Sequence, residues 1–199
     1  MRIAAIFLET IRLKNIQGLI FLLGVIGCAS TTTNSQRVSS YVNKTSSLNV
    51  LFVDSTFDEK STKGQFNASK ANTDLSEFGT AFVDRASSEF TKNGITANIS
   101  RADPTDPRVK SFGLGSVLGS PSAEAALLTI QPLTAATRCT AGCHVFRMKV
   151  TYYDYKSKKT VWTGVMDTPP KLSRFSDFSA PADSFIAELI KNLKTQTLI

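Results

Sequence analysis

Histidine is almost absent from this chain of 199 residues, which contains only His144. An arrangement of the Ser-His-Asp or Cys-His type therefore has a single possible centre. The Gly-x-Ser-x-Gly turn that presents the nucleophile of many hydrolases does not occur in the sequence. Paired carboxylates such as Asp103 and Asp106 fall in a proline-rich segment, where turn formation explains them. We therefore expect no catalytic residue, no metal site and no enzymatic activity.

Long basic runs and long apolar runs are also missing. The net charge is +7, yet no block of Lys and Arg is longer than Lys158-Lys159, so a nucleic-acid partner is not expected. The dispersed charge is compatible with a mildly basic face toward anionic lipid or glycan. The uncharged run 16–26 is about half of the roughly 20 residues that a permanent membrane-spanning helix needs. A retained transmembrane anchor is therefore disfavoured.

The N-terminal segment has the layout of a secretory signal peptide. Basic residues precede the uncharged run 18–26, and the small residues Gly27 and Ala29 flank Cys28. A basic region, an apolar region and a small-residue cleavage zone define such a signal. We therefore predict that residues 1–27 are a signal peptide, with a buried cysteine in a core helix as the alternative.

The end of this segment resembles the lipobox of bacterial lipoproteins. The matching residues are Val25-Ile26-Gly27-Cys28. The resemblance implies cleavage before Cys28 and acylation of its thiol, so the covalent lipid would be the only prosthetic group. Ala29 is not the Asp that tends to retain such proteins at the inner membrane, which implies the outer membrane, with the domain facing the periplasm. Each buried methylene contributes about 0.8 kcal/mol, so several acyl chains would anchor the chain firmly.

The residues that follow are polar. Removal of residues 1–27 would take three basic side chains and one acidic side chain with it, which leaves a net charge of +5. Residues 28–47 are rich in Ser, Thr and Asn and predict a flexible tether, which could extend over about 60 Å. Residues 48–199 are long enough for one domain with a sizeable core.

The apolar pattern predicts an α+β domain with a single mixed β-sheet and two main helices. Strands are expected at 48–54, 95–100, 125–133, 145–154 and 160–168, the last two joined by a turn at 156–159. A first helix is expected from an N-cap at Asp74 to a stop at Asn93-Gly94, with apolar residues at 75, 78, 82, 86 and 90. A second is expected from Pro181, with Phe185, Leu189 and Leu193 on one side.

This order resembles that of small periplasmic lipoprotein domains. The similar features are the opening "LNVLFVD", the hairpin "TYYDYKSKKTVWTG" and the closing amphipathic helix. The domains in question are those of the penicillin-binding-protein activator lipoproteins, the curli-secretion lipoprotein and the N-terminal domain of the Tol translocation protein. The resemblance implies binding of protein partners without catalysis, although a shared fold does not transfer a function by itself.

The segment Cys139-Thr140-Ala141-Gly142-Cys143-His144 is compatible with three kinds of site. In an oxidising periplasm, Cys139 and Cys143 could close a short disulfide loop, contributing roughly 2 kcal/mol. The segment also resembles the c-type haem attachment motif with one extra residue between the cysteines, and Met148 or Met166 could then supply an axial ligand. A zinc site would have only three ligands in view. We predict the disulfide and keep a periplasmic redox or haem protein as the alternative function.

Recognition is expected in two loops, 101–122 and 134–144. Within the first, "GLGSVLG" lacks the Lys-Ser/Thr ending of a phosphate-binding loop, so a surface loop or short helix is favoured over a nucleotide site. Loops on a rigid scaffold commonly carry recognition. We therefore predict a non-catalytic binding or assembly module of the cell envelope that contacts a protein partner through Arg108, Lys110 and Arg138.

Overall fold

The domain is one mixed β-sheet with helices on both faces. The computed structural model describes residues 32–38, 41, 43–57, 67–118, 125–137, 143–171 and 177–199. The strands are β1 (Thr32–Arg37), β2 (Ser47–Val53), β3 (Thr96–Ala102), β4 (Ala126–Thr137), β5 (His144–Asp154) and β6 (Lys159–Asp167). The helices are α2 (Ala68–Lys92), α3 (Pro107–Phe112), the short 3-10 helix η3 (Leu114–Val117) and α4 (Ser179–Thr195). The predicted α+β class with a single mixed sheet is confirmed.

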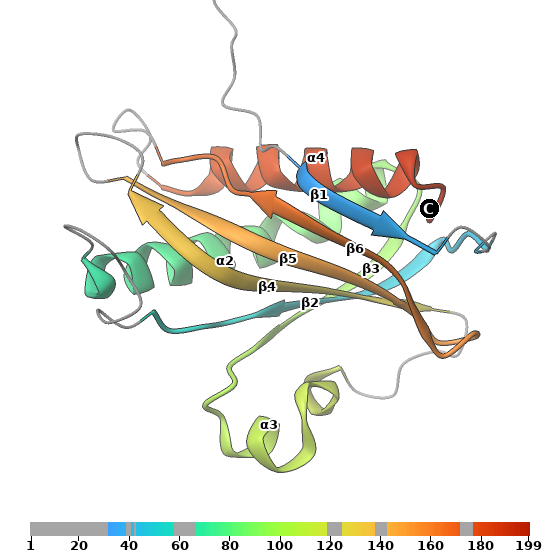
Figure 1. Ribbon diagram of the computed structural model, residues 1–199, viewed down its shortest axis with the longest axis horizontal. Coiled ribbons are helices and arrows are strands. Elements are labelled where there is room, and N and C mark those ends of the chain that lie inside the picture. Colours follow the sequence, from blue (N-terminus) through green and yellow to red (C-terminus); the bar gives the residue numbers. More distant parts are fainter. Residues whose placement is uncertain are drawn as a thin grey trace, which may run out of the picture.

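The strand order is β1-β6-β5-β4-β2-β3. Strand β2 pairs in parallel with both β3 and β4, whereas β4, β5, β6 and β1 pair in antiparallel fashion. Helix α2 connects β2 to β3 on one face of the sheet, and the segment containing α3 and η3 connects β3 to β4 on the other (Figure 1). The carboxyl ends of β2 and β3 therefore open between these two connections.

Burial on both faces explains why five of the seven residues of β2 are apolar. Leu48, Val50 and Phe52 point into the main core under α2 and α4, and Leu51 and Val53 point into a smaller cluster under α3 and η3. Strand β5 is buried on one face only. There, Phe146, Met148, Val150 and Tyr152 are buried, while Arg147 and Lys149 are exposed. The predicted alternation of β5 and the hairpin that it forms with β6 are confirmed.

Helix α2 begins earlier than predicted. The N-cap is Asn67, whose side chain accepts a hydrogen bond from the Lys70 backbone N–H, so the predicted N-cap Asp74 lies inside the helix. The first two turns bury only the small residues Ala68 and Ala71, which produced no apolar signal in the sequence. The predicted apolar stripe and the stop at Asn93-Gly94 are correct, and Gly94 has a φ of 78°.

The expected tether differs from the structure at β1. Residues 32–37, which lie within the range 28–47, form a strand that pairs with β6. The Trp162 indole N–H donates to the Ser35 hydroxyl over 2.7 Å, and Tyr41 is buried against Tyr152. The folded part therefore begins at or before residue 32 rather than at residue 48.

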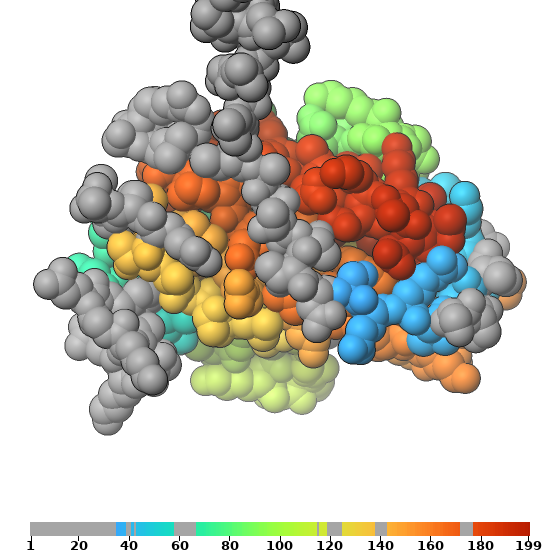
Figure 2. Space-filling model, turned by 45° about the horizontal axis from the view of Figure 1, so that its top comes forward, coloured from blue at the N-terminus to red at the C-terminus, as the bar shows by residue number. Residues whose placement is uncertain are grey.

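Two other elements extend beyond their predicted bounds. Strand β4 continues to Thr137, and its register shifts between Pro132 and Thr134 because proline cannot donate to the ladder. Helix α4 starts at Ser179, and Phe185, Leu189 and Leu193 are buried as expected. Figure 2 shows α4 beside β1 on the surface of the molecule.

Candidate functional site

An open pocket lies at the carboxyl ends of β2 and β3. It has a volume of about 570 Å³ and is bordered by the ends of both strands, the first turns of α2 and the segment before α3. In sheets with parallel strands, ligands commonly bind where the connections on either side of a strand diverge to opposite faces. The lining residues are Asp54, Ser55, Thr56, Asn72, Leu75, Ser76, Arg101, Asp103, Pro104 and Thr105.

The Arg101 guanidinium connects the end of β3 to β2 and α2. Its Nε donates to both carboxylate oxygens of Asp54, at 2.9 and 2.7 Å. Its Nη1 donates to the Thr80 hydroxyl over 2.8 Å, and its Nη2 donates to the Ser76 hydroxyl over 3.0 Å. Charge-assisted bonds of this kind are among the stronger hydrogen bonds in proteins. Arg101 therefore fixes the floor of the pocket.

A glycine on α2 makes room for this arrangement. A Cβ atom at Gly79 would lie 3.3 Å from the Arg101 Cζ and 2.8 Å from the Phe52 ring. The absence of a side chain at Gly79 lets the guanidinium and the ring approach the helix together. Glycine at position 79 therefore permits the close contact of Arg101 and Phe52 with α2.

The rim of the pocket is held by turn hydrogen bonds. Asp103 accepts from both the backbone N–H and the hydroxyl of Thr105, each over 2.7 Å, and these bonds lower the pKa of the Asp103 carboxyl. Asn72 donates to the Phe57 carbonyl and accepts from its backbone N–H. The Phe57 ring in turn stacks on Phe146 (ring centroids 6.1 Å apart). The Phe57 end of the rim is therefore fixed to the core, and the Asp103 end is held by a local turn.

The lining residues are suited to hydrogen bonding rather than to acid–base chemistry. Effective general bases have a pKa near the working pH, and the pKa of the hydroxyl-bound Asp103 carboxyl is shifted in the opposite direction. The Ser76 hydroxyl accepts its bond from Arg101, so that contact does not activate it as a nucleophile. A small polar molecule could be bound here through hydroxyl, amide and carboxylate groups.

Helix α3 follows directly from this pocket. Asp106 caps its start by accepting from the Arg108 backbone N–H over 2.7 Å, and this bond is the main cause of the lowered pKa of Asp106. Pro107 occupies the first turn, and Gly113, with a φ of 77°, ends the helix. The sequence therefore specifies a short helix with defined ends at this position.

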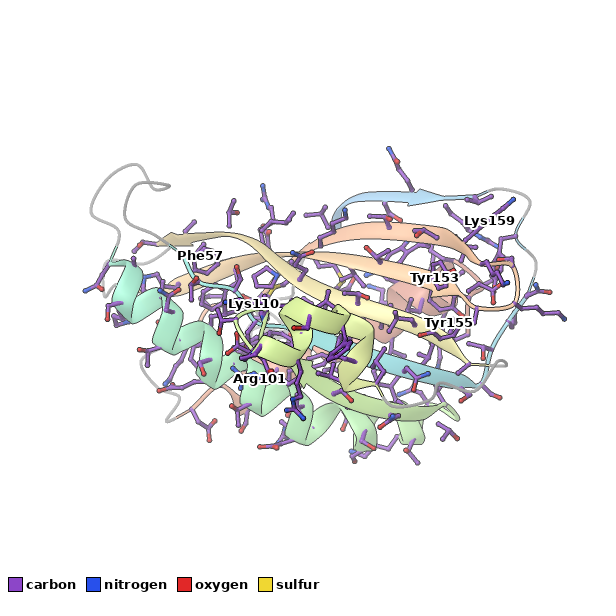
Figure 3. All side chains as sticks on the ribbon, turned by 90° about the horizontal axis from the view of Figure 1, so that it is seen from below. Phe57, Arg101, Lys110, Tyr153, Tyr155 and Lys159 are labelled. Carbon is purple, nitrogen blue, oxygen red and sulfur yellow. The ribbon has the colours of Figure 1, made fainter. Side chains whose placement is uncertain are left out.

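Helix α3 presents both charge and apolar surface to solvent. Val109 is buried, whereas Phe112 is 78% exposed. Arg108 and Lys110, two of the predicted partner-binding residues, are exposed on the same helix. Figure 3 shows Lys110 on α3 in front of the open sheet face, with Tyr153 and Tyr155 farther along that face. Arg138, the third predicted residue, lies outside the described residues.

His144 is a core residue. Its side chain is 2% exposed, its Nδ1 lies 2.7 Å from the Asp74 carboxylate, and its ring stacks on Phe146. Lys70 also contacts Asp74, over 3.3 Å. The single histidine therefore joins β5 to α2, and nothing in the sequence indicated Asp74 as its partner.

The other predicted site residues are only partly described. Cys28 and Cys139 lie outside the described residues, so the acylation and the disulfide stay predictions. Cys143 is 7% exposed just before β5. Met148 and Met166, the axial ligands considered for the haem alternative, are buried in the main core. The fit of the segment to haem is therefore poor.

Metal and membrane features can be stated for the described ranges alone. Within them, no group of three or more His, Cys, Asp and Glu side chains is placed to hold a metal ion. No helix in the same ranges is both long enough and apolar enough to cross a membrane. Arg101 and Phe112 were not among the predicted site residues. For Phe112, the available signal was an aromatic residue directly before the glycine that ends a short helix begun by proline.

Comparisons with known proteins place the chain near several bacterial proteins at low similarity. No family model matches it, and no curated protein sequence matches it significantly. A PelC dodecamer from Paraburkholderia phytofirmans is similar with 14% identity and a TM-score of 0.40, over 82% of this chain and 96% of that chain. Lipoprotein GNA1162 from Neisseria meningitidis has 15% identity and a TM-score of 0.34, over 75% and 96%. Protein XCC0632 from Xanthomonas campestris has 10% identity and a TM-score of 0.36, over 81% and 87%.

One of these three similar structures is a bacterial lipoprotein. All three TM-scores are 0.40 or lower and all three identities are 15% or lower, so the similar structures identify neither a ligand nor a partner for this chain.

Proposed function

We propose that this chain is an outer-membrane lipoprotein, acylated on Cys28, whose domain is a non-catalytic binding module facing the periplasm. Its partner is an envelope protein, and helix α3 is the contact element. The proposal includes a disulfide between Cys139 and Cys143, and no cofactor other than the lipid.

The observation that carries the proposal is the exposed aromatic side chain on α3. Phe112 is 78% exposed on a short helix that is rigidly capped at both ends. Aromatic and arginine side chains contribute most to protein interfaces, and a pre-formed element loses little conformational entropy on binding. Arg108 and Lys110 beside Phe112 favour a partner surface with acidic residues around an apolar pocket.

The haem alternative is less well supported by the geometry. His144 contacts Asp74 and is 2% exposed, so its use as an axial ligand would require the β5–α2 contact to open. Purified protein without a Soret band is expected. A Soret band that is lost in Cys143→Ala would favour the alternative.

Crosslinking in intact cells tests the proposed partner contact. We expect Phe112→Ser to abolish crosslinking to an envelope protein while the thermal midpoint stays within about 2 °C, because an exposed side chain contributes little to folding. The matched control is Leu133→Ser, which removes an exposed apolar residue, 45% accessible, from β4. Crosslinks that survive Phe112→Ser, or that are lost equally in both variants, would contradict a contact through α3.

The anchor is tested separately. We expect the wild-type chain to incorporate labelled palmitate, and Cys28→Ala to remain unlabelled and uncleaved. A wild-type protein that takes up no label and retains residues 1–27 would contradict the lipoprotein assignment.

A further inference from the structure

Seven exposed lysines gather at one end of the domain. We call this set the lysine end; it comprises Lys44, Lys92, Lys156, Lys158, Lys159, Lys191 and Lys194. They come from the segment before β2, the last turns of α2 and α4, and the β5–β6 turn. Figures 1 and 2 show these segments together at the right-hand end of the molecule.

Hydrogen bonds and strand register place these segments side by side. The Thr96 backbone N–H donates to the Ser46 carbonyl over 2.8 Å, and the Thr45 N–H donates to the Leu198 carbonyl over 3.1 Å. The Lys194 ammonium donates to the Asn93 side chain over 2.7 Å, which joins the ends of α4 and α2. In the sheet, Leu48 is opposite Ala126, Ala126 is opposite Asp154, and Asp154 is opposite Lys159.

The lysine end accounts for the net charge of the described residues. Three acidic side chains lie there, Glu89, Asp154 and Glu188, which leaves an excess of +4, or +3 when the carboxylate of Ile199 is counted. The remaining described residues carry nine basic and nine acidic side chains. The excess positive charge of the described residues is therefore concentrated at one end of the domain.

The acidic side chains at this end leave the β5–β6 turn uncompensated. Glu89 and Glu188 pair with lysines of their own helices, Lys92 and Lys191. Asp154 is 7% exposed, and its carboxylate accepts from the backbone N–H groups of Lys156 and Ser157 beneath the turn. Among the described residues, the ammonium groups of Lys156, Lys158 and Lys159 form no ion pair, because the Asp154 carboxylate beneath them bonds to the backbone of the turn.

The chemistry of these side chains indicates a diffuse anionic surface. The exposed cations of the lysine end are all lysines, because Arg37, which ends β1 near them, is half-buried and donates to the Tyr41 carbonyl. Arginine is the side chain that recognises single carboxylates or phosphates in a fixed bidentate geometry. Ammonium groups on flexible stems instead adapt to many headgroups, and each contributes about 1 kcal/mol near an anionic membrane.

The start of β1 brings the lysine end within reach of a bilayer that holds the anchor. Only residues 29–31 separate Cys28 from Thr32, so the two are at most about 14 Å apart. Thr32 is opposite Met166, and Lys159 lies seven residues from Met166, about 23 Å along β6. Thr32 lies at the opposite end of β6 from Lys159, so the anchor and the lysine end reach one bilayer together when the β1–β6 edge of the sheet lies along it.

We propose that the lysine end binds anionic phospholipid headgroups of the leaflet that carries the lipid anchor, so that the domain has a second, electrostatic membrane contact. The distance argument rests on the proposed acylation of Cys28, whereas the charge argument does not. A covalent lipid and a basic patch together fix a protein at a membrane more firmly than either does alone.

Lysine acetylation on vesicles tests this proposal with the full chain as cells process it. The protein is incubated with phosphatidylcholine vesicles or with mixed vesicles of phosphatidylcholine and phosphatidylglycerol, and acetylation rates are read by mass spectrometry. In about 0.1 M salt we expect Lys158 and Lys159 to react about fivefold more slowly on the anionic vesicles. The protection should disappear in about 1 M salt, where the screening length falls to about 3 Å. Lys110 and Lys149, outside the lysine end, serve as internal controls.

A pair of variants separates a specific contact from general charge. Lys158→Glu with Lys159→Glu should remove the protection of Lys156, whereas Lys110→Glu with Lys149→Glu, an equal change in net charge, should leave it intact. Equal acetylation on both vesicle types, or equal protection of the control lysines, would overturn the proposal. Protection by a soluble acidic glycan without protection by anionic vesicles would also overturn it, in favour of a glycan partner.

A failure of the proposed acylation is distinguishable from a failure of the lysine end. A chain that does not float with pure phosphatidylcholine vesicles has no membrane-inserted lipid, which contradicts the proposed function. Protection of Lys158 and Lys159 on anionic vesicles in that same chain would still support the lysine end as a headgroup-binding surface.

Discussion

Substitution of Gly164 by alanine tests how β1 is held to the sheet. A Cβ atom at Gly164 would lie 2.5 and 2.7 Å from two atoms of the Trp162 ring, which is closer than side chains pack. Gly164 is directly opposite Ser35, so the indole crosses the glycine to reach the Ser35 hydroxyl on β1. The ring must therefore move, and it must weaken or lose its hydrogen bond.

The expected cost follows from the crowding of a buried ring. Trp162 is 1% exposed, and forcing an extra methyl group into a packed core typically costs about 1–3 kcal/mol. For a domain of this size, each kcal/mol lowers the thermal midpoint by about 2–4 °C. Trp162 is the only tryptophan in the chain, so its emission spectrum reports its own displacement. We expect a lower midpoint together with a red-shifted emission maximum in Gly164→Ala.

A double-mutant cycle with Ser35→Ala tests whether Gly164→Ala acts through the Trp162–Ser35 hydrogen bond. Ser35→Ala alone should cost about 0.5–1.5 kcal/mol, the usual net value of a hydrogen bond, without moving the ring. Because both substitutions act on the same bond, the double variant should lose less than the sum of the two single losses. A Gly164→Ala protein that is as stable as the wild type and keeps the wild-type emission spectrum would refute this account of β1.

Three further predictions concern the pocket, the core and the cysteines. Arg101→Ala should lower the free energy of unfolding in urea by about 1–3 kcal/mol, because the half-buried Asp54 carboxylate loses its charged donor. Burial raises the pKa of Tyr152 above its ordinary value of 10.0, so the stability that its neutral form provides is complete below pH 10 and falls as the pH rises further; Tyr152→Phe should lessen this alkaline loss. Intact-mass measurement of exported protein should show two hydrogens missing across Cys139 and Cys143, restored by reduction.

A specific result would contradict each of these three predictions. Arg147→Ala removes an arginine that is more exposed and donates to Asp167 alone, whereas Arg101 also donates to Thr80 and Ser76. A loss in Arg101→Ala no greater than in this control would therefore argue against a structural role for the pocket floor. Tyr153→Phe is the control for alkaline unfolding, and equal pH profiles for the two phenylalanine variants would assign that loss to other groups. Cysteines that alkylate without prior reduction would remove the disulfide from the proposal.

Local sequence was sufficient where a residue's neighbours along the chain settle its structure. The stripe of α2, the stop at Asn93-Gly94 and the β5–β6 hairpin follow from periodicity and turn chemistry, and all three were predicted. The start of α2 was not, because Ala68 and Ala71 are buried yet too small to mark an apolar face. Among the site residues, Arg108 and Lys110 were identified as exposed charges, but the exposure of the Phe112 ring depends on how α3 packs.

Strands β2 and β1 differ most clearly in how far their own sequences determine their structure. The apolar residues of β2 determine by themselves that it is buried on both faces, because the exposure of each to water is unfavourable. Strand β1 is polar throughout and, taken alone, predicts a tether; it is a strand only because the edge of β6 is free to pair with it and the Trp162 indole reaches Ser35 across Gly164. The gathering of seven lysines at one end has the same origin, since they are dispersed in sequence and meet only where the ends of the strands and helices converge. Sequence thus determined which segments are buried, and tertiary structure decided that the folded part includes β1 and where its charge lies.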